Sequence, residues 1–194
     1  MPELETVPGS SERRTPSHIF DALKVEFDLD VAHPGVGAGA GVCHVPTKRF
    51  FTKADNGLLQ PWPKHEFLWN NPPYSEGRHS IVPWMEKYFE HGNGIALIPA
   101  RTSCDWWHHL VFVHAQLICF PDRKISFLQP DGKVEGSNTL GSALIGMGEI
   151  ACNALRQSGL GHCVIVDRSA APSLRRRSNR RGGASAIDVR RTTP

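Results

Sequence analysis

The chain has 194 residues, of which 40% are hydrophobic and 21% are charged, and its formal net charge is +3 at pH 7. This length and apolar fraction suffice for one globular domain with a buried core, and they exclude a wholly disordered chain. No apolar run approaches the roughly 18 residues that span a bilayer, and the N-terminal residues are too polar for a signal peptide. We therefore expect a soluble, cytoplasmic protein without a membrane partner.

The two ends of the chain differ in composition from its centre. Residues 168–194 are rich in Arg, Ser, Gly and Pro and have little to bury, so a disordered basic tail is predicted there, with a flexible leader at residues 1–14. These bounds leave one predicted domain at residues 15–167. The five cysteines are scattered and form no C-x-x-C pair. Free thiols and no metal site are expected.

Hydrophobic periodicity and turn residues predict alternating helices and strands. In chain order, the sequence predicts a helix at 16–26, a strand at 27–32, a glycine-rich loop at 33–42, strands at 49–52 and 66–69, a helix at 80–92, a strand at 94–100, a helix at 104–115, a strand at 116–120, a turn at Asp131-Gly132, a strand at 142–148, a helix ended by glycine within 149–161 and a strand at 162–167. The helix at 80–92 is expected to place Ile81, Val82, Met85 and Phe89 on one face. Such alternation indicates an α/β fold of three layers, with helices on both faces of a mainly parallel sheet.

A rigid polar motif, Asn71-Pro72-Pro73-Tyr74, follows the predicted strand at 66–69. In α/β folds, ligands bind beyond the carboxyl ends of the strands, so the motif lies where chemistry is expected. Two prolines fix φ at successive positions and hold the Pro72 carbonyl beside the Asn71 side-chain oxygen. Two such acceptors suit the two hydrogens of an amino group, and Tyr74 offers a face on which a planar ring can stack. The motif therefore indicates a site for an exocyclic amine.

The tetrapeptide resembles motif IV of S-adenosylmethionine-dependent amino methyltransferases, whose form is (Asp/Asn/Ser)-Pro-Pro-(Tyr/Phe/Trp). The flanking segments narrow the resemblance. They resemble the phage-type DNA N6-adenine methyltransferase (Dam-like) family over about residues 15–167, in TPSHIFDALKVEFDLDVA, RFFTKADNGLLQPW, FLWNNPPYS, PWMEKYFEHG and IALIPARTSCDWWHHL. The resemblance implies a Rossmann-like methyltransferase fold, S-adenosyl-L-methionine as cofactor and a role in protecting DNA from restriction. If the protein is phage-encoded, its location would be the host cytoplasm.

The same resemblance implies which residues line the cofactor pocket. Thr15, Pro16 and Phe20 would correspond to the first helix of the family, which contains a Thr-Pro pair. Asp30 and Ala32 would correspond to its Asp-Pro-Cys-Ala segment, and Asp55 to an acidic residue before motif IV. The chain departs from the family here, because it has Asp30-Val31-Ala32-His33 followed by a long glycine run. That run, residues 35–41, suits either close approach to a cofactor or a flexible loop.

The implied reaction is direct transfer, in which the adenine N6 attacks the methyl group in line. Asn71 and the Pro72 carbonyl, held by Pro73, would orient the amine, and Tyr74 would hold the ring. The target base must leave the helix to reach such a site, so double-stranded DNA is the expected substrate. Tyr74, Ser75 and Arg101 are the expected DNA contacts, and residues 121–141 are the expected specificity loop.

Other functions share these residue types. N4-cytosine has a similar exocyclic amine, and both RNA bases and a protein glutamine amide present the same two donors. A catalytically silent DNA-binding module is a further alternative. A C5-cytosine mechanism is disfavoured because it needs a Pro-Cys pair. No obligate protein partner is evident from the sequence.

Overall fold

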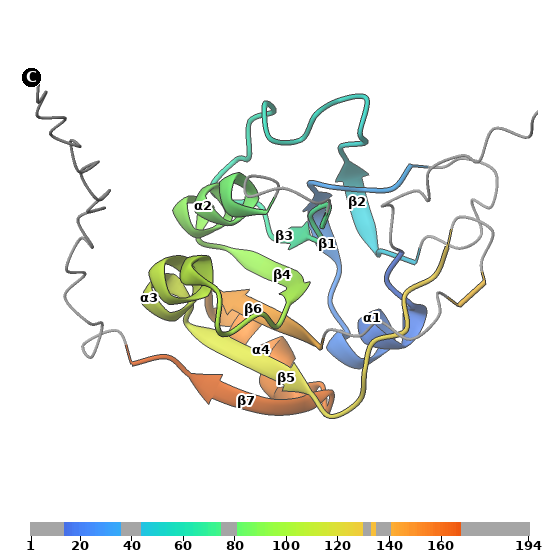
Figure 1. Ribbon diagram of the computed structural model, residues 1–194. Helices are drawn as coiled ribbons and strands as arrows, with labels where there is room; N and C mark the ends of the chain where they lie inside the picture. The colour runs from blue at the N-terminus through green and yellow to red at the C-terminus, as the bar shows by residue number, and fades with distance from the viewer. Residues whose placement is uncertain (1–13, 36–43, 75–80, 130–132, 135–140, 168–194) are drawn as a thin grey trace, which may run out of the picture.

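The computed structural model describes residues 14–35, 44–74, 81–129, 133–134 and 141–167 (Figure 1). Helices and strands alternate through most of this part of the chain. In order they are α1 (Ser17–Leu23), β1 (Phe27–Asp30), β2 (Thr47–Phe50), β3 (Leu68–Asn70), α2 (Val82–His91), β4 (Gly94–Pro99), the π-helical turn η2 (Trp107–Val111), α3 (Phe112–His114), β5 (Leu117–Pro121), β6 (Ser142–Met147), α4 (Glu149–Gln157) and β7 (Gly161–Ile165).

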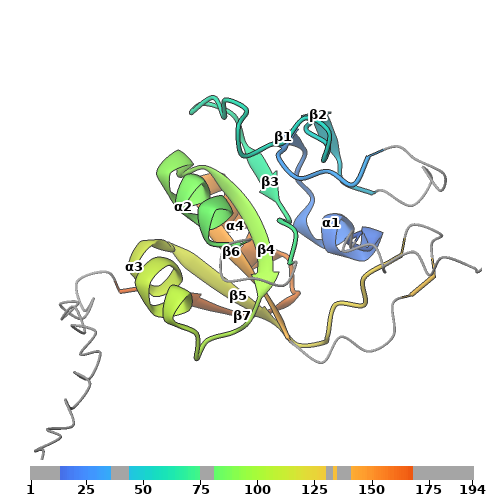
Figure 2. The same cartoon turned by 45° about the horizontal axis from the view of Figure 1, so that its top comes forward.

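All of these strands form one sheet, in the order β2-β1-β3-β4-β6-β5-β7. Strands β2, β1, β3 and β4 pair in parallel, whereas β6 is antiparallel to both of its neighbours, β4 and β5. Strand β5 consequently runs in the same direction as β1 to β4, and β7 pairs with it in antiparallel fashion at the edge. Figure 2 shows β1, β2 and β3 together at one end of the sheet, with β5 and β7 at the other.

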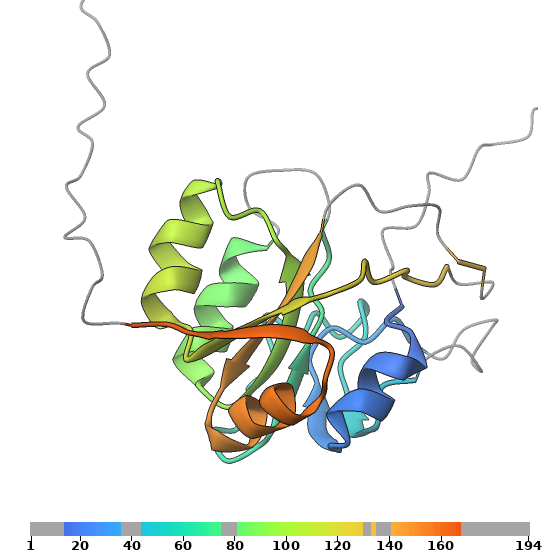
Figure 3. The ribbon, with the colours of Figure 1, turned by 90° about the horizontal axis from the view of Figure 1, so that it is seen from below.

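Helices cover both faces of the sheet, and a separate hydrophobic core fills each side (Figure 3). On one side, Ile19 and Phe20 of α1 and Leu155 of α4 pack against the strands. On the other side, Met85 and Tyr88 of α2 lie in one cluster with residues of η2. The predicted three-layer α/β architecture is confirmed, and it suits a Rossmann-like methyltransferase fold.

The sheet is less uniformly parallel than the sequence predicts, because β6 and β7 run against the other strands. A short apolar run has the same composition in either direction, so the pattern of residues carried no information on this point. The segment after β5 turns back on itself, and a backbone bridge joins Leu128 to Val134. The predicted turn at Asp131-Gly132 between them lies outside the described residues.

Two helices differ from their predicted form. Helix α1 ends at Leu23, three residues early, because Lys24 adopts a left-handed conformation (φ 54°) and its N–H caps the Phe20 carbonyl. The predicted apolar face of α2 contributes only part of its contact with the core. Met85 is buried and Ile81 and Phe89 pack partly buried against the same cluster, but the other buried residues of this helix are Trp84, Tyr88 and His91.

The Tyr88 hydroxyl lies 2.7 Å from the carbonyls of both Gly94 and Ile145 and has one proton to donate to either, so this polar residue is satisfied inside the core. The π-helical turn η2 explains a second difference. It buries Trp107 and Val111, whereas the other residues of the helix predicted at 104–115 are partly or fully exposed, apart from Ala115 at its end.

Several predictions concern segments outside the described residues. They are the leader before Arg14, most of the glycine-rich loop, Ser75 and the basic tail. Arg14 itself is 3% exposed, and its backbone forms a bridge with Leu128. No helix in the described part of the chain has the length and hydrophobicity needed to cross a membrane.

Candidate active site

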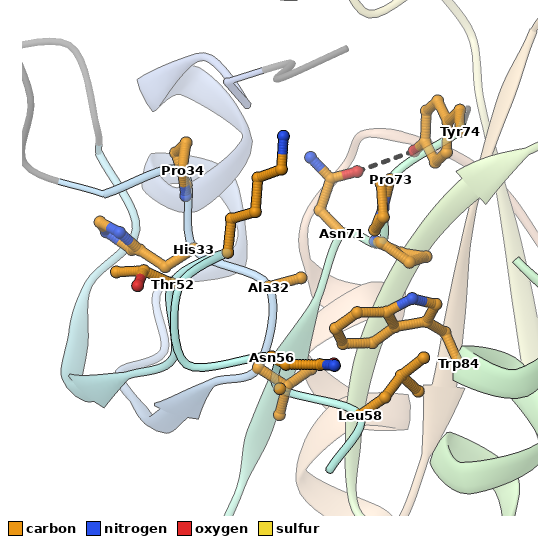
Figure 4. A pocket seen from close by; sticks show the side chains of 14 residues that line it. Ala32, His33, Pro34, Thr52, Asn56, Leu58, Asn71, Pro73, Tyr74 and Trp84 are labelled. Carbon is orange, nitrogen blue, oxygen red and sulfur yellow. Dashed lines mark hydrogen bonds between the residues drawn. The ribbon is translucent and has the colours of Figure 1, made fainter. Parts of the chain in front are cut away.

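A cavity of about 510 Å³ opens where β1, β2 and β3 end (Figure 4). Because these strands are parallel, their carboxyl ends meet at one edge of the sheet and the segments that follow them face one another. Residues 31–34 follow β1, residues 52–58 follow β2, and residues 71–74 follow β3, with Trp84 of α2 completing the lining. The volume is in the range of small-molecule and cofactor sites.

The wall that follows β1 is held by backbone hydrogen bonds to the segment after β2. The Phe51 N–H donates to the Asp30 carbonyl at 2.8 Å, and the His33 N–H donates to the Phe51 carbonyl at 2.9 Å. The His33 ring stacks on Phe50 with 4.1 Å between ring centroids. Burial lowers the pKa of His33, and the nearby positive charge of Arg14 lowers it further. A neutral imidazole therefore lines the cavity at neutral pH.

Asp30 lies at the end of β1, behind this wall, and is only 1% exposed. Burial raises its pKa to about 7, against the opposing effect of the Ala32 N–H, which donates to Oδ1 at 3.0 Å. Burial away from water destabilises the ionised form of this carboxyl group. Groups with strongly shifted pKa values are frequent at functional sites. Ala32 lines the cavity, so Asp30 fixes the backbone of a lining residue.

Asp55 plays a comparable part in the wall that follows β2. Its Oδ2 accepts from the Thr52 N–H at 2.8 Å and from the Thr52 hydroxyl at 2.7 Å. These bonds lower the pKa of the exposed Asp55 carboxyl. Thr52 and Asn56 line the cavity, whereas Asp55 closes the turn that presents them.

The third wall is the motif Asn71-Pro72-Pro73-Tyr74, and all four residues line the cavity. The Asn71 amide is oriented from both of its ends: Nδ2 donates to Thr15 Oγ1 at 3.3 Å, and Oδ1 accepts from the Tyr74 hydroxyl at 2.8 Å (Figure 4). The same hydroxyl lies 2.9 Å from the Leu97 carbonyl. One hydroxyl proton thus has two acceptors within reach. The Tyr74 ring meets Phe127 edge to face, at 6.2 Å between centroids.

The residues predicted for cofactor binding divide into two groups. Ala32 lines the cavity, and Thr15, Asp30 and Asp55 support lining residues from behind. Pro16, the residue before α1, is buried. Phe20 belongs to the hydrophobic core, where its ring packs edge-on against Trp69 at 4.9 Å.

Of the predicted DNA contacts, Tyr74 lines the cavity and Ser75 lies outside the described residues. Arg101 is exposed beyond the carboxyl end of β4, where its N–H donates to the Pro99 carbonyl at 2.8 Å. It is not a lining residue of the cavity. Its side chain is directed to solvent rather than held in a core.

Several residues that line the cavity were not predicted from the sequence. They include His33, Pro34, Thr52, Asn56, Leu58 and Trp84. Trp84 shares the helical spacing of Tyr88 and His91, a pattern that could have indicated a buried face, but nothing in it distinguishes a lining residue from ordinary core. The Thr52-x-x-Asp55 spacing is a turn signal that pointed to a fixed loop after β2.

The sequence profile of the DNA N-6-adenine-methyltransferase (Dam) family matches residues 9–153, which is more than half of the chain. The match includes all three walls of the cavity. No curated protein and no solved structure matches the chain. With an α/β sheet of the expected kind and an Asn-Pro-Pro-Tyr motif at the carboxyl edge, the chain belongs to the DNA N-6-adenine-methyltransferase (Dam) family and is an enzyme that methylates adenine in DNA.

Proposed function

We propose that the enzyme transfers a methyl group from S-adenosyl-L-methionine to N6 of adenine in double-stranded DNA. The observation that carries the proposal is a cavity of cofactor size, about 510 Å³, with the Asn71 amide fixed on one wall. The other walls are the segments after β1 and β2. The cavity thus has room for a methyl donor beside the group that orients the acceptor.

The residues present fit this cofactor. Trp84 and Leu58 give the cavity apolar surface suited to a planar purine, and Thr52 and Asn56 add polar groups of the kind that bind sugar hydroxyls. Ala32 and the neutral His33 complete this side. Three further residues would act indirectly, through hydrogen bonds to lining residues: Asp30 holds Ala32, Asp55 holds Thr52 and Thr15 holds Asn71. Phe20 and Pro16 would act through the packing of α1. The bound cofactor supplies a methyl group on a positively charged sulfur.

The acceptor side is built from Asn71 and Pro72. Asn71 Oδ1 and the Pro72 carbonyl would each accept one hydrogen of the adenine amine, which aims the nitrogen lone pair at the methyl group and stabilises the positive charge that N6 acquires. Asn71 Oδ1 has two lone pairs, so it can accept from the adenine amine while it still accepts from the Tyr74 hydroxyl. Pro73 restricts the backbone that carries both acceptors.

Double-stranded DNA is proposed because adenine N6 in a duplex is paired and stacked. The base would have to turn out of the helix to enter this cavity, and contact with Tyr74 would offset part of the unstacking free energy. Arg101, exposed at the same edge of the sheet, is proposed to contact a backbone phosphate. Cation–phosphate contacts predict binding that weakens as salt rises.

The proposal is tested by methyl transfer from radiolabelled S-adenosyl-L-methionine into unmethylated duplex DNA, followed by nucleoside analysis. Matched single-stranded DNA and RNA of the same sequence serve as competing substrates. Label in N6-methyladenine, with duplex preferred, supports the proposal. Label in N4-methylcytosine would show that the modified base is cytosine rather than adenine. Label only in RNA or only in single-stranded DNA would contradict the proposed duplex substrate.

Tyr74→Phe keeps the ring and removes the hydroxyl that contacts Asn71. We expect kcat to fall about tenfold, as one hydrogen bond in the orienting network is worth roughly that factor. The KM for S-adenosyl-L-methionine should stay within about twofold, because the hydroxyl faces Asn71 and Leu97. Steady-state kinetics on duplex DNA check this. A kcat equal to wild type would show that Asn71 is held without Tyr74.

A further inference from the structure

The cavity wall that follows β2 has no regular structure of its own. Between Phe50, the last residue of β2, and Leu68, the first of β3, the chain forms only turns and coil. Thr52, Asn56, Gly57 and Leu58 nevertheless line the cavity from this segment. Backbone bonds to Asp30 and His33 hold the start of this wall, and turn bonds such as that from the Leu59 N–H to the Asn56 carbonyl shape the rest, which side chains from other elements must then hold against the fold.

Lys87 of α2 makes such contacts. Its Nζ donates to the Leu58 carbonyl at 2.6 Å and to the Gln60 carbonyl at 2.5 Å. The same ammonium lies 4.6 Å from the centre of the Trp62 ring. An ammonium has three N–H donors, so two carbonyls and one aromatic face match its capacity. The side chain is half-buried, and burial lowers the pKa of Lys87, with Glu90 opposing that effect.

Trp62 connects Lys87 to residues that line the cavity. Its Nε1–H donates to the Gly57 carbonyl at 2.9 Å, and its ring lies 6.2 Å from that of Trp84, a lining residue. Gly57 in turn packs against the segment after β1, since a Cβ there would meet the Val31 carbonyl oxygen at 2.0 Å. Lys87, which does not line the cavity, is thus linked by direct contacts to the walls after β1 and β2.

We propose that Lys87 is a positioning residue that holds the wall at residues 56–62 in its cofactor-binding shape. The inference rests on the proposed function, because it assigns this wall to S-adenosyl-L-methionine. The acceptor group Asn71 lies on a different wall, held by Thr15 and Tyr74. Loss of Lys87 should therefore affect the cofactor and leave the DNA substrate and the chemical step nearly unchanged.

Lys64 provides a matched control. It too donates from Nζ to a backbone carbonyl, that of Glu90 at 2.5 Å, and so links the same segment to α2. Its contact is at the far end of the segment, and it does not line the cavity. Lys87→Met and Lys64→Met remove the same donor and keep a similar stem.

The test measures KM for each substrate, kcat and calorimetric binding of S-adenosyl-L-methionine for the full-length variants. Lys87→Met is expected to raise KM and Kd for the cofactor about tenfold, with kcat and the KM for DNA within about twofold, because two charge-assisted bonds are lost on one wall. Lys64→Met should match wild type in every parameter. Trp62→Phe, which keeps an aromatic ring but loses the indole N–H that donates to the Gly57 carbonyl, should raise the cofactor KM to a smaller extent.

Three results would overturn the inference. One is an unchanged cofactor KM in folded Lys87→Met, and another is an equal rise in Lys64→Met. If Lys87→Met does not fold, an unchanged cofactor KM in Trp62→Phe decides against the proposal. Wild-type protein that binds no S-adenosyl-L-methionine would instead refute the proposed function, and the assigned ligand of this wall with it.

Discussion

Replacing Asn71 with alanine should lower kcat on duplex DNA by about a thousandfold, the size of effect seen when a preorganised polar group is removed from a reacting centre. Asn71 is held from both ends of its amide, by Thr15 and by Tyr74, so it reaches the substrate in one orientation. Affinity for S-adenosyl-L-methionine should remain within a few-fold of wild type, because the walls after β1 and β2 are untouched. Methyl transfer and calorimetry together check both parts.

The adjacent Asn70 is a matched control for this substitution. It is fully buried, it is not a lining residue of the cavity, and neither of its amide atoms has a hydrogen-bond partner among the described residues. We expect Asn70→Ala to keep kcat within about threefold, since the variant removes an amide that contributes no hydrogen bond there. A thousandfold loss in both variants would mean that the end of β3 tolerates no truncation, and the acceptor role of Asn71 would lose its support.

Asp30→Asn should stabilise the protein at pH 8 and not at pH 4. The folded pKa of Asp30 is raised by burial to about 7, against an ordinary value of 3.8. Between these two pH values the folded state keeps a proton that the unfolded state has released, so stability falls as pH rises from about 4 to about 7 and levels off above. The buried carboxylate costs up to about 4 kcal/mol at high pH, and asparagine removes that cost.

Urea denaturation of wild type and Asp30→Asn at pH 4, 6 and 8 measures this difference directly. The two unfolding free energies should converge at the acidic end, and the variant should lead by a growing margin toward pH 8. Asparagine can still accept from the Ala32 N–H, so the local turn is preserved. A constant difference across the range would show that Asp30 titrates normally in the folded protein.

The sequence predicted the features that depend on local chemistry. Alternation of apolar strands with amphipathic helices fixed the α/β class, and the Pro72-Pro73 pair after a buried strand located one wall of the cavity. The assignment of Thr15 to the site came from the family resemblance alone. Its contact with Asn71 spans 56 residues, a separation that no local pattern can report.

Features that depend on packing between distant elements were not predictable. Phe20 was expected at the cofactor pocket, but it lies against Trp69 in the core, and an aromatic residue on a helix has the same pattern in either role. Trp84 lines the cavity for a reason visible only in three dimensions, because the fold brings α2 beside the segments that follow β1, β2 and β3. The direction of β6 likewise follows from its pairing with β4 rather than from its composition.

The bridge between Arg14 and Leu128 has a consequence for protein synthesis. The N-terminal residues that reach Asn71 through Thr15 are fastened to a segment made more than a hundred residues later. A nascent chain that has left the ribosome only as far as Tyr74 carries Thr15 and the complete Asn-Pro-Pro-Tyr motif, but it lacks Leu128, which fastens the residue next to Thr15. We therefore expect Thr15 to hold Asn71 in a fixed orientation only after the chain has emerged past Leu128.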